Sequence, residues 1–266
     1  MRNVKKLVIV AIIFIIVGTV GSIVTFGSRD TGEKVATEKF VDATNVTRIS
    51  IEGDNETVRI SPTKEKEIRI TWTGTAKKNA DRTMQVELDG ENLKIQTKQR
   101  QFFQFFDFNF HSMILHVYLP EKEYQALSAD LDNGKIQASN LVVKDMEVET
   151  SNGQIELNKL ETEKLAAKTN NGRIQLDEVS GELIGEADNG SIYLETDDLD
   201  RPIALETNNG KIKIKAASEP ENATFAVSVS NGKVNIFNKY SENAVFGNGD
   251  NLIQLSTDNG KIDVTK

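Results

Sequence analysis

The sequence predicts an all-β protein, a β-solenoid of about 19-residue rungs that is preceded by one transmembrane helix. Three observations predict this arrangement. Seven Asn-Gly pairs recur at similar spacing, apolar and polar residues alternate on both sides of each pair, and one long uncharged run lies near the N-terminus. The alternation has the period of a strand with one buried face, whereas a helix needs a period near 3.6.

The uncharged run, residues 7–26, reads LVIVAIIFIIVGTVGSIVTF. A helix of this length spans about 30 Å, which is the thickness of the hydrocarbon core. Arg2, Lys5 and Lys6 precede the run, and the charges that follow it cancel. The positive-inside rule therefore predicts a single-pass protein of the cell membrane, with residues 1–6 as a cytoplasmic tail and the C-terminal domain extracytoplasmic. A cleaved signal peptide is the alternative, but no Ala-x-Ala cleavage motif follows the run.

The remaining chain divides into three predicted parts. Residues 27–45 are mostly polar and are interpreted as a linker between the membrane and the domain. Residues 46–120 contain short alternating segments and predict an irregular N-terminal β cap that covers the open sheet edge. Within this cap, Asp54-Asn55 and Asp89-Gly90 are interpreted as degenerate corners. Residues 121–266 predict the regular Asn-Gly repeat solenoid.

The predicted corners of the rungs are the Asn-Gly pairs. Successive Asn residues are 19, 19, 18, 20, 22 and 28 positions apart. Asn and Gly tolerate a positive φ better than other residues, so we expect them to turn the chain at each corner. The pairs are Asn133-Gly134, Asn152-Gly153, Asn171-Gly172, Asn189-Gly190, Asn209-Gly210, Asn231-Gly232 and Asn259-Gly260.

Two folds satisfy this pattern. Each Asn-Gly pair either closes a hairpin in an antiparallel meander or forms the corner of one solenoid rung. A hairpin would set Glu149 opposite Glu156 and would leave an apolar sheet face that no helix-forming stretch can cover. In a solenoid, the two strands of each rung face one another across a shared core, which favours the solenoid.

Two groups of residues are candidate contact surfaces. Position two after each Asn is basic in five rungs, so a solenoid would stack these side chains into a ladder that suits an anionic cell-wall polymer or an envelope protein. The simpler explanation is a solvated charged face. The second group is a run of aromatic residues, which would form either a contact patch or a plug at one end of the column. The residues are Lys135, Arg173, Lys211, Lys233 and Lys261 in the ladder and Phe102, Phe103, Phe105 and Phe106 in the aromatic run.

Composition excludes several functions. The 266 residues include no Cys and two His, which argues against thiol catalysis, disulfide scaffolds and His-rich metal centres. A net charge of -8 argues against a nucleic-acid partner. We predict no catalytic residue, no metal site and no cofactor. The alternative is a carbohydrate-active β-helix enzyme, a polysaccharide lyase or hydrolase, which would need an acid and a base that converge in a groove.

The rungs VETSNGQIELNKL and AKTNNGRIQLDEV resemble the bacterial putative-adhesin domain family of unknown function, which includes the membrane-anchored LiaG-type proteins of envelope-stress operons. The resemblance covers about residues 46–266. It implies a membrane-anchored β-solenoid that faces outward and acts as a non-enzymatic binding or scaffold module at the cell envelope, with a link to the response to cell-envelope stress. The family offers no catalytic residue for this sequence.

Overall fold

The computed structural model describes residues 33–76, 81–100 and 113–266, and in these ranges all regular structure is strand. The predicted membrane helix over residues 7–26 lies outside them. No helix in the described ranges has the length and apolar character needed to cross a bilayer. The strands are β1 (Glu33–Asp42), β2 (Arg48–Gly53), β3 (Thr57–Thr63), β4 (Glu67–Ala76), β5 (Asp81–Asp89), β6 (Asn92–Arg100), β7 (Met113–Pro120), β8 (Glu123–Glu161), β9 (Lys164–Val179), β10 (Glu182–Thr196), β11 (Ile203–Ala216), β12 (Ala223–Ile236), β13 (Ala244–Phe246) and β14 (Asn251–Thr265).

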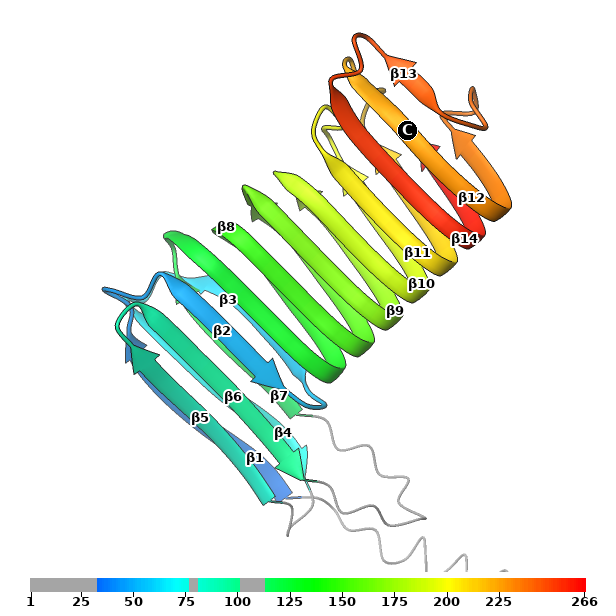
Figure 1. Cartoon of the computed structure of the whole chain (residues 1–266). Coiled ribbons are helices and arrows are strands. Elements are labelled where there is room, and N and C mark those ends of the chain that lie inside the picture. Colours follow the sequence, from blue (N-terminus) through cyan, green and yellow to red (C-terminus); the bar gives the residue numbers. More distant parts are fainter. Residues whose placement is uncertain (1–32, 77–80, 101–112) are drawn as a thin grey trace, which may run out of the picture.

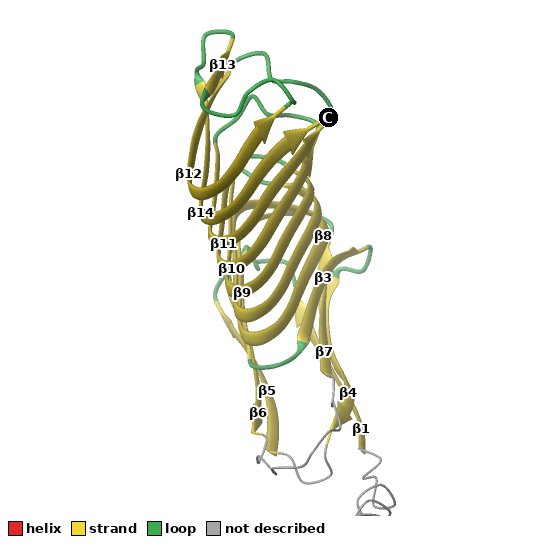
Figure 2. Ribbon diagram, turned by 90° about the vertical axis from the view of Figure 1, so that its right-hand side faces the viewer, coloured by secondary structure: helices red, strands yellow, loops and turns green. Residues whose placement is uncertain are grey.

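The regular part of the chain is a column of parallel rungs, as Figure 1 shows. Each strand from β8 to β11 continues through its Asn-Gly corner and pairs in parallel with the next rung, so that Asn189 lies between Asn171 and Asn209. Figure 2 shows the strands bending back at one side of the column, which gives every rung two strands that face each other. The parallel register confirms the solenoid-like repeat and excludes the hairpin meander, which requires antiparallel pairs.

The core lies between the two strands of each rung. The residue three positions after each Asn is Ile in six rungs, and all six side chains are fully buried. Burial of one such side chain contributes about 2 kcal/mol to the free energy of folding. The predicted alternation of inward apolar and outward polar residues is therefore confirmed. The six residues are Ile136, Ile155, Ile174, Ile192, Ile212 and Ile262.

Chain order and spatial order differ at the C-terminal end. The last strand, β14, lies between β11 and β12, so that Asn259 pairs with Asn209 on one side and Asn231 on the other. The 28-residue step before Asn259, the longest in the repeat, accommodates the segment that returns the chain. β12 therefore forms the end of the column, and β13 pairs antiparallel with its first residues.

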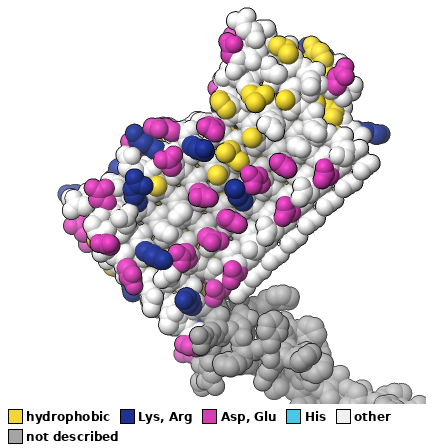
Figure 3. All heavy atoms as spheres, viewed as in Figure 1, with side chains coloured by type: hydrophobic (Ala, Val, Ile, Leu, Met, Phe, Trp, Pro, Cys, Tyr) yellow, Lys and Arg dark blue, Asp and Glu magenta, His cyan; other side chains and the backbone are white. Residues whose placement is uncertain are grey.

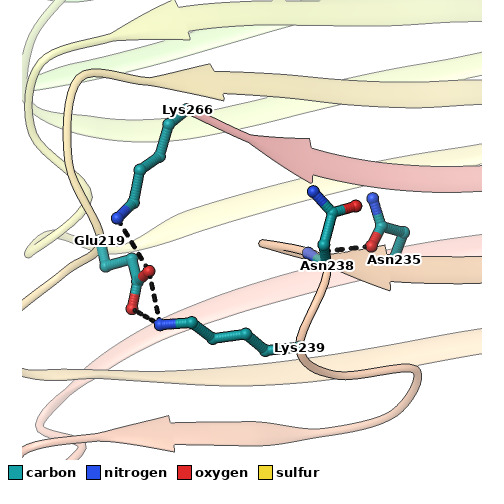
Figure 4. A network of polar contacts seen from close by, with 5 residues as sticks. All are labelled: Glu219, Asn235, Asn238, Lys239 and Lys266. Carbon is teal, nitrogen blue, oxygen red and sulfur yellow. Dashed lines mark hydrogen bonds and ion pairs between the residues drawn. The ribbon is translucent and has the colours of Figure 1, made fainter.

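A small cap closes this end of the column. The rings of Phe225, Phe237 and Phe246 pack edge to face, with centroids 5.8–6.2 Å apart. In the same C-terminal part of the chain, the carboxylate of Glu219 accepts hydrogen bonds from Lys239 and pairs with Lys266 at 2.9 Å (Figure 4). The hydrogen bonds from these two lysines lower the pKa of Glu219. The network thus joins the turn after β12 to the C-terminal residue of the inserted rung.

The N-terminal part forms one more rung and the opposite end of the column. β2 and β3 pair in parallel with the two halves of the first β8 rung, so Asp54-Asn55 is a corner as predicted. Asp89-Gly90 is instead the turn of an antiparallel hairpin between β5 and β6, where Gly90 has a φ of 59°. The structure also corrects the predicted linker, because residues 33–42 form β1, which pairs with β4 at the sheet edge.

Candidate functional site

The Asn side chains of the corners form one continuous amide ladder along the column. Each Asn donates a hydrogen bond from its Nδ2 to the Oδ1 of the Asn in the preceding rung, at 2.9–3.1 Å. The ladder begins at Asn55, which the repeat count had treated as degenerate, and it ends at Asn231. In spatial order it contains Asn55, Asn133, Asn152, Asn171, Asn189, Asn209, Asn259 and Asn231.

The glycines of the corners are required by space. A Cβ atom on any of the six glycines after Gly134 would lie 1.5–1.8 Å from the carbonyl oxygen of the neighbouring glycine, which no side chain can occupy. The expectation that the Asn-Gly pairs use positive φ is wrong. Among the residues of the seven pairs, only Gly134 has a positive φ, at 139°. Positive φ occurs instead at the other bend of the rung, at Asn140, Lys159 and Glu178. The corners are thus selected for amide pairing and close backbone approach.

Glu56 carries a buried carboxyl group at the N-terminal end of the row of stacked corner glycines. Register places it where the next rung has Gly134, and its side chain is 2% exposed. Its Oε2 accepts the backbone N–H of Asn55 at 3.0 Å, and its Oε1 accepts the hydroxyl of Thr97. Burial raises the pKa of Glu56 to about 7. Sequence reasoning missed this residue, although aligning Asn55 with Asn133 would have exposed the exchange of glycine for glutamate.

Glu56 makes stability depend on pH. The folded state retains a proton that the unfolded state loses above a pKa of 4.5, so the contribution is complete below pH 4.5 and is lost as pH rises to about 7. The expected loss in the free energy of unfolding is about 3 kcal/mol, since one pKa unit corresponds to about 1.4 kcal/mol. Urea unfolding of Glu56→Gln between pH 5 and pH 8 should lack this decrease.

The control is Glu87→Gln, on the exposed edge strand β5, which should keep the pH dependence of the wild-type protein. An unchanged pH dependence in Glu56→Gln would contradict the assignment of the buried proton to this residue.

The column has two broad faces with different charge. The first-strand face comprises the residues one, three, five and seven positions before each Asn of the seven Asn-Gly corners, and Figure 3 shows this side of the molecule. It carries ten acidic and two basic residues. These are Asp130, Asp132, Asp145, Glu147, Glu149, Glu182, Glu186, Asp188, Glu206 and Asp258, with Lys164 and Lys168.

The second-strand face comprises the residues two, four and six positions after each of these Asn residues, and it has the opposite sign. It carries seven basic and four acidic residues, and it includes all five members of the predicted basic ladder. The parallel register thus brings the predicted ladder together, although chain order placed Lys233 before Lys261. The residues are Lys135, Arg173, Lys211, Lys213, Lys215, Lys233 and Lys261, with Glu156, Asp177, Glu195 and Asp263.

Several members of the ladder are neutralised by carboxylates of neighbouring positions. Lys135 pairs with Glu156 at 2.7 Å, and Lys261 and Lys211 approach Asp263 at 3.1 and 3.9 Å. Burial acts to raise the pKa of Glu156, but hydrogen bonds from Lys135 and Gln137 outweigh burial, so this pKa is lowered. The ladder therefore offers fewer free cations than its sequence predicts.

A depression of about 350 Å³ interrupts the second-strand face across β9, β10 and β11. Tyr193 lies in it, partly exposed, with Gln175 and Lys213 as its register partners on the two adjacent rungs. Lys215 pairs with Glu195 at 2.6 Å on its rim. Sequence reasoning missed Tyr193, although the rung alignment shows an aromatic residue among polar ones at the position four after Asn.

A second depression, of about 520 Å³, lies on the first-strand side across β6, β2, β8 and β9. Small side chains such as Ser50, Ala126 and Ala166 line it. Its lysines are already paired, Lys94 with Glu52 at 2.8 Å and Lys164 with Glu182 at 3.6 Å. The other charged residues of its lining, Arg48, Asp145 and Glu147, have mixed sign, so this depression does not favour a ligand of one charge.

The predicted aromatic contact patch, Phe102, Phe103, Phe105 and Phe106, lies outside the described residues, as does His111. The choice between a contact patch and a plug for this segment stays a prediction.

Comparison with known proteins identifies the repeat. No curated protein matches the chain. Residues 46–184 and 139–265 match the family described as Toastrack DUF4097, so together the two matches span the described rungs. The chain belongs to the Toastrack DUF4097 family. The Toastrack match covers the predicted cap as well as the regular repeat, consistent with the rung formed by β2 and β3.

Solved structures similar to this Toastrack chain are distant in sequence. A putative cell adhesion protein from Clostridium sporogenes is 13% identical, with a TM-score of 0.45, and the match covers 88% of this chain and 99% of that chain. A putative adhesin from Bacteroides fragilis is 11% identical, with a TM-score of 0.49, and the match covers 88% and 98%. A putative adhesin from Parabacteroides merdae is 17% identical, with a TM-score of 0.40 and coverage of 89% and 98%.

Proposed function

We propose that this protein is a membrane-anchored, extracytoplasmic binding or scaffold module of the cell envelope that acts without catalysis. The observation that carries the proposal is the separation of charge between the two broad faces of the column. Parallel stacking fixes the backbone of each rung to its neighbours, so the charged rows keep a constant spacing of about 4.8 Å. Such a surface suits a partner with its own regular charges, such as an anionic wall polymer or an envelope protein.

The proposed location in the cell membrane and the outward orientation rest on the sequence. Residues 7–26 are uncharged and long enough to span the hydrocarbon core, and basic residues precede them. Resemblance to LiaG-type proteins supports a place in the response to cell-envelope stress. The test is protease treatment of intact spheroplasts that express the full chain with a C-terminal tag. We expect loss of the tag in intact spheroplasts, and a protected tag would overturn the outward orientation.

Binding is tested with two double variants of equal charge. The full chain in detergent is immobilised and exposed to purified anionic wall polymer. Lys211→Glu with Lys233→Glu alters the second-strand face and should reduce retention at least tenfold. Lys164→Glu with Lys168→Glu makes the same change in net charge on the first-strand face and should have little effect. Equal losses in both variants would show that net charge alone controls retention.

The alternative function is a carbohydrate-active enzyme, and one observation favours it. Asp177 and Glu195 are register partners and both line the depression of the second-strand face. However, Glu195 forms an ion pair with Lys215 at 2.6 Å, and Asp177 accepts a hydrogen bond from Asn158 at 2.6 Å. Both carboxyl groups are therefore engaged with neighbouring side chains, whereas a general acid must be free to pass a proton to the substrate. Release of reducing ends from wall polysaccharide, abolished by Glu195→Gln, would favour the enzyme.

A further inference from the structure

The depression around Tyr193 differs from the rest of the second-strand face in having an aromatic floor. Tyr193 occupies the outward position four residues after the Asn of its rung. In the other six rungs this position holds Gln, Glu, Lys, Asp or Asn. An aromatic ring offers a flat apolar surface together with a hydroxyl group, a combination that suits the apolar face of a sugar ring. In a regular solenoid such a ring has no packing role, because the core lies on the opposite side of the strand.

Two cations beside Tyr193 have no carboxylate partner within ion-pair distance in the described part of the chain. Arg173 precedes it on β9 and Lys213 follows it on β11. The guanidinium carbon of Arg173 lies 5.5 Å from the ring centroid, near the outer limit of a cation–π interaction, so it can turn toward an anion at little cost. The other charges of the depression are already engaged, since Lys215 pairs with Glu195 and Asp177 accepts from Asn158.

The spacing of these groups limits the size of the ligand unit. Arg173 and Lys213 lie two rungs apart, or about 10 Å along the column, with the tyrosine ring between them. Two linked sugar units with acidic substituents span such a distance. The volume of about 350 Å³ accommodates one or two sugar units and leaves the chain free to continue along the column.

We propose that this depression binds an acidic saccharide, with a sugar ring against Tyr193 and the anionic groups of the saccharide paired with Arg173 and Lys213 on either side of that ring. The inference deepens the proposed binding function and rests on it, because it names the chemistry of the ligand. The acidic first-strand face repels the same ligand, so binding is restricted to one side of the column.

The test measures binding of oligogalacturonate, an anionic saccharide, to the full chain in detergent by microscale thermophoresis. Neutral maltohexaose and inorganic polyphosphate are the comparison probes, since they separate the sugar ring from the charge. The wild-type protein should bind oligogalacturonate at least tenfold more tightly than either comparison probe. Tyr193→Ser and Lys213→Gln should each weaken binding at least tenfold, whereas Tyr193→Phe should retain it because it keeps the flat ring.

The control is Lys168→Gln on the first-strand face, which removes the same charge as Lys213→Gln and should leave affinity unchanged. Equal binding of polyphosphate, or an equal loss in Lys168→Gln, would reduce the effect to charge attraction and overturn the saccharide inference. Absence of oligogalacturonate binding would also overturn it. Neither result would contradict the proposed envelope function, which stands on retention of wall polymer and on the orientation test.

Discussion

Gly210→Ala is expected to lower the free energy of unfolding by about 3 kcal/mol or more, because the added methyl group would overlap a backbone atom. The Cβ would lie 1.5 Å from the carbonyl oxygen of Gly190 and 3.0 Å from the hydroxyl oxygen of Thr207. The rungs β9 and β11, on either side of Gly190, fix the position of that carbonyl oxygen, so relief would require moving the register of several strands. Urea unfolding followed by far-ultraviolet circular dichroism measures the change.

Gly90→Ala separates this effect from the conformational preference of glycine. Gly90 has a φ of 59° and no atom within 4 Å of its Cβ position, so alanine should cost only about 1 kcal/mol there. Similar losses in the two variants would show that the corner glycines are not selected by space.

Deletion of residues 251–266 is expected to unfold the C-terminal end of the column while β8 to β11 remain folded. The deletion removes β14, which is the only strand neighbour of residues 226–236 among the described residues. β12 and β13 would then have no rung beneath them, and the cluster of Phe225, Phe237 and Phe246 would be exposed. Repeat architectures depend on nearest-neighbour contacts, so the rungs below should keep their own pairs.

Amide hydrogen exchange measures this result residue by residue. Protection in β12 should fall to that of an unfolded segment, while protection in β9 and β10 persists. Deletion of Lys266 alone is the control, since it removes one ion pair with Glu219 and leaves β14 in place. If β12 stays protected in the longer deletion, then β14 is not what holds the end of the column together.

The rung architecture could be predicted from the sequence because its cause is local and repeated. Ile174 and Leu176 follow Asn171 at alternating positions, and the same spacing recurs in each rung, so burial and parallel stacking follow from one pattern. The alignment of the basic ladder could be predicted for the same reason, because its members stand at the same position of each rung. The physical role of the Asn-Gly pair did not, because an amide ladder and a carbonyl contact appear only when two rungs are placed side by side.

The remaining features depend on contacts between distant segments. The place of β14 between β11 and β12 depends on which strand edge is unpaired when the chain returns. The spacing before Asn259 gives only the length of the returning segment. Glu56 is buried because β6 places Thr97 against it from 41 residues away. Residues 33–42 belong to the segment that the sequence predicts as a linker. They form strand β1 because they pair with β4, which is distant in the sequence.

The amide ladder also has an electrical direction. Every side-chain N–H of the stacked asparagines points toward Asn55 and every side-chain oxygen toward Asn231, so the individual amide moments add along the axis. The row behaves as one elongated dipole, with its positive pole beside Glu56 and its negative pole at the far tip. The insertion of β14 preserves this polarity, because a parallel strand keeps its amide in the same sense as its neighbours.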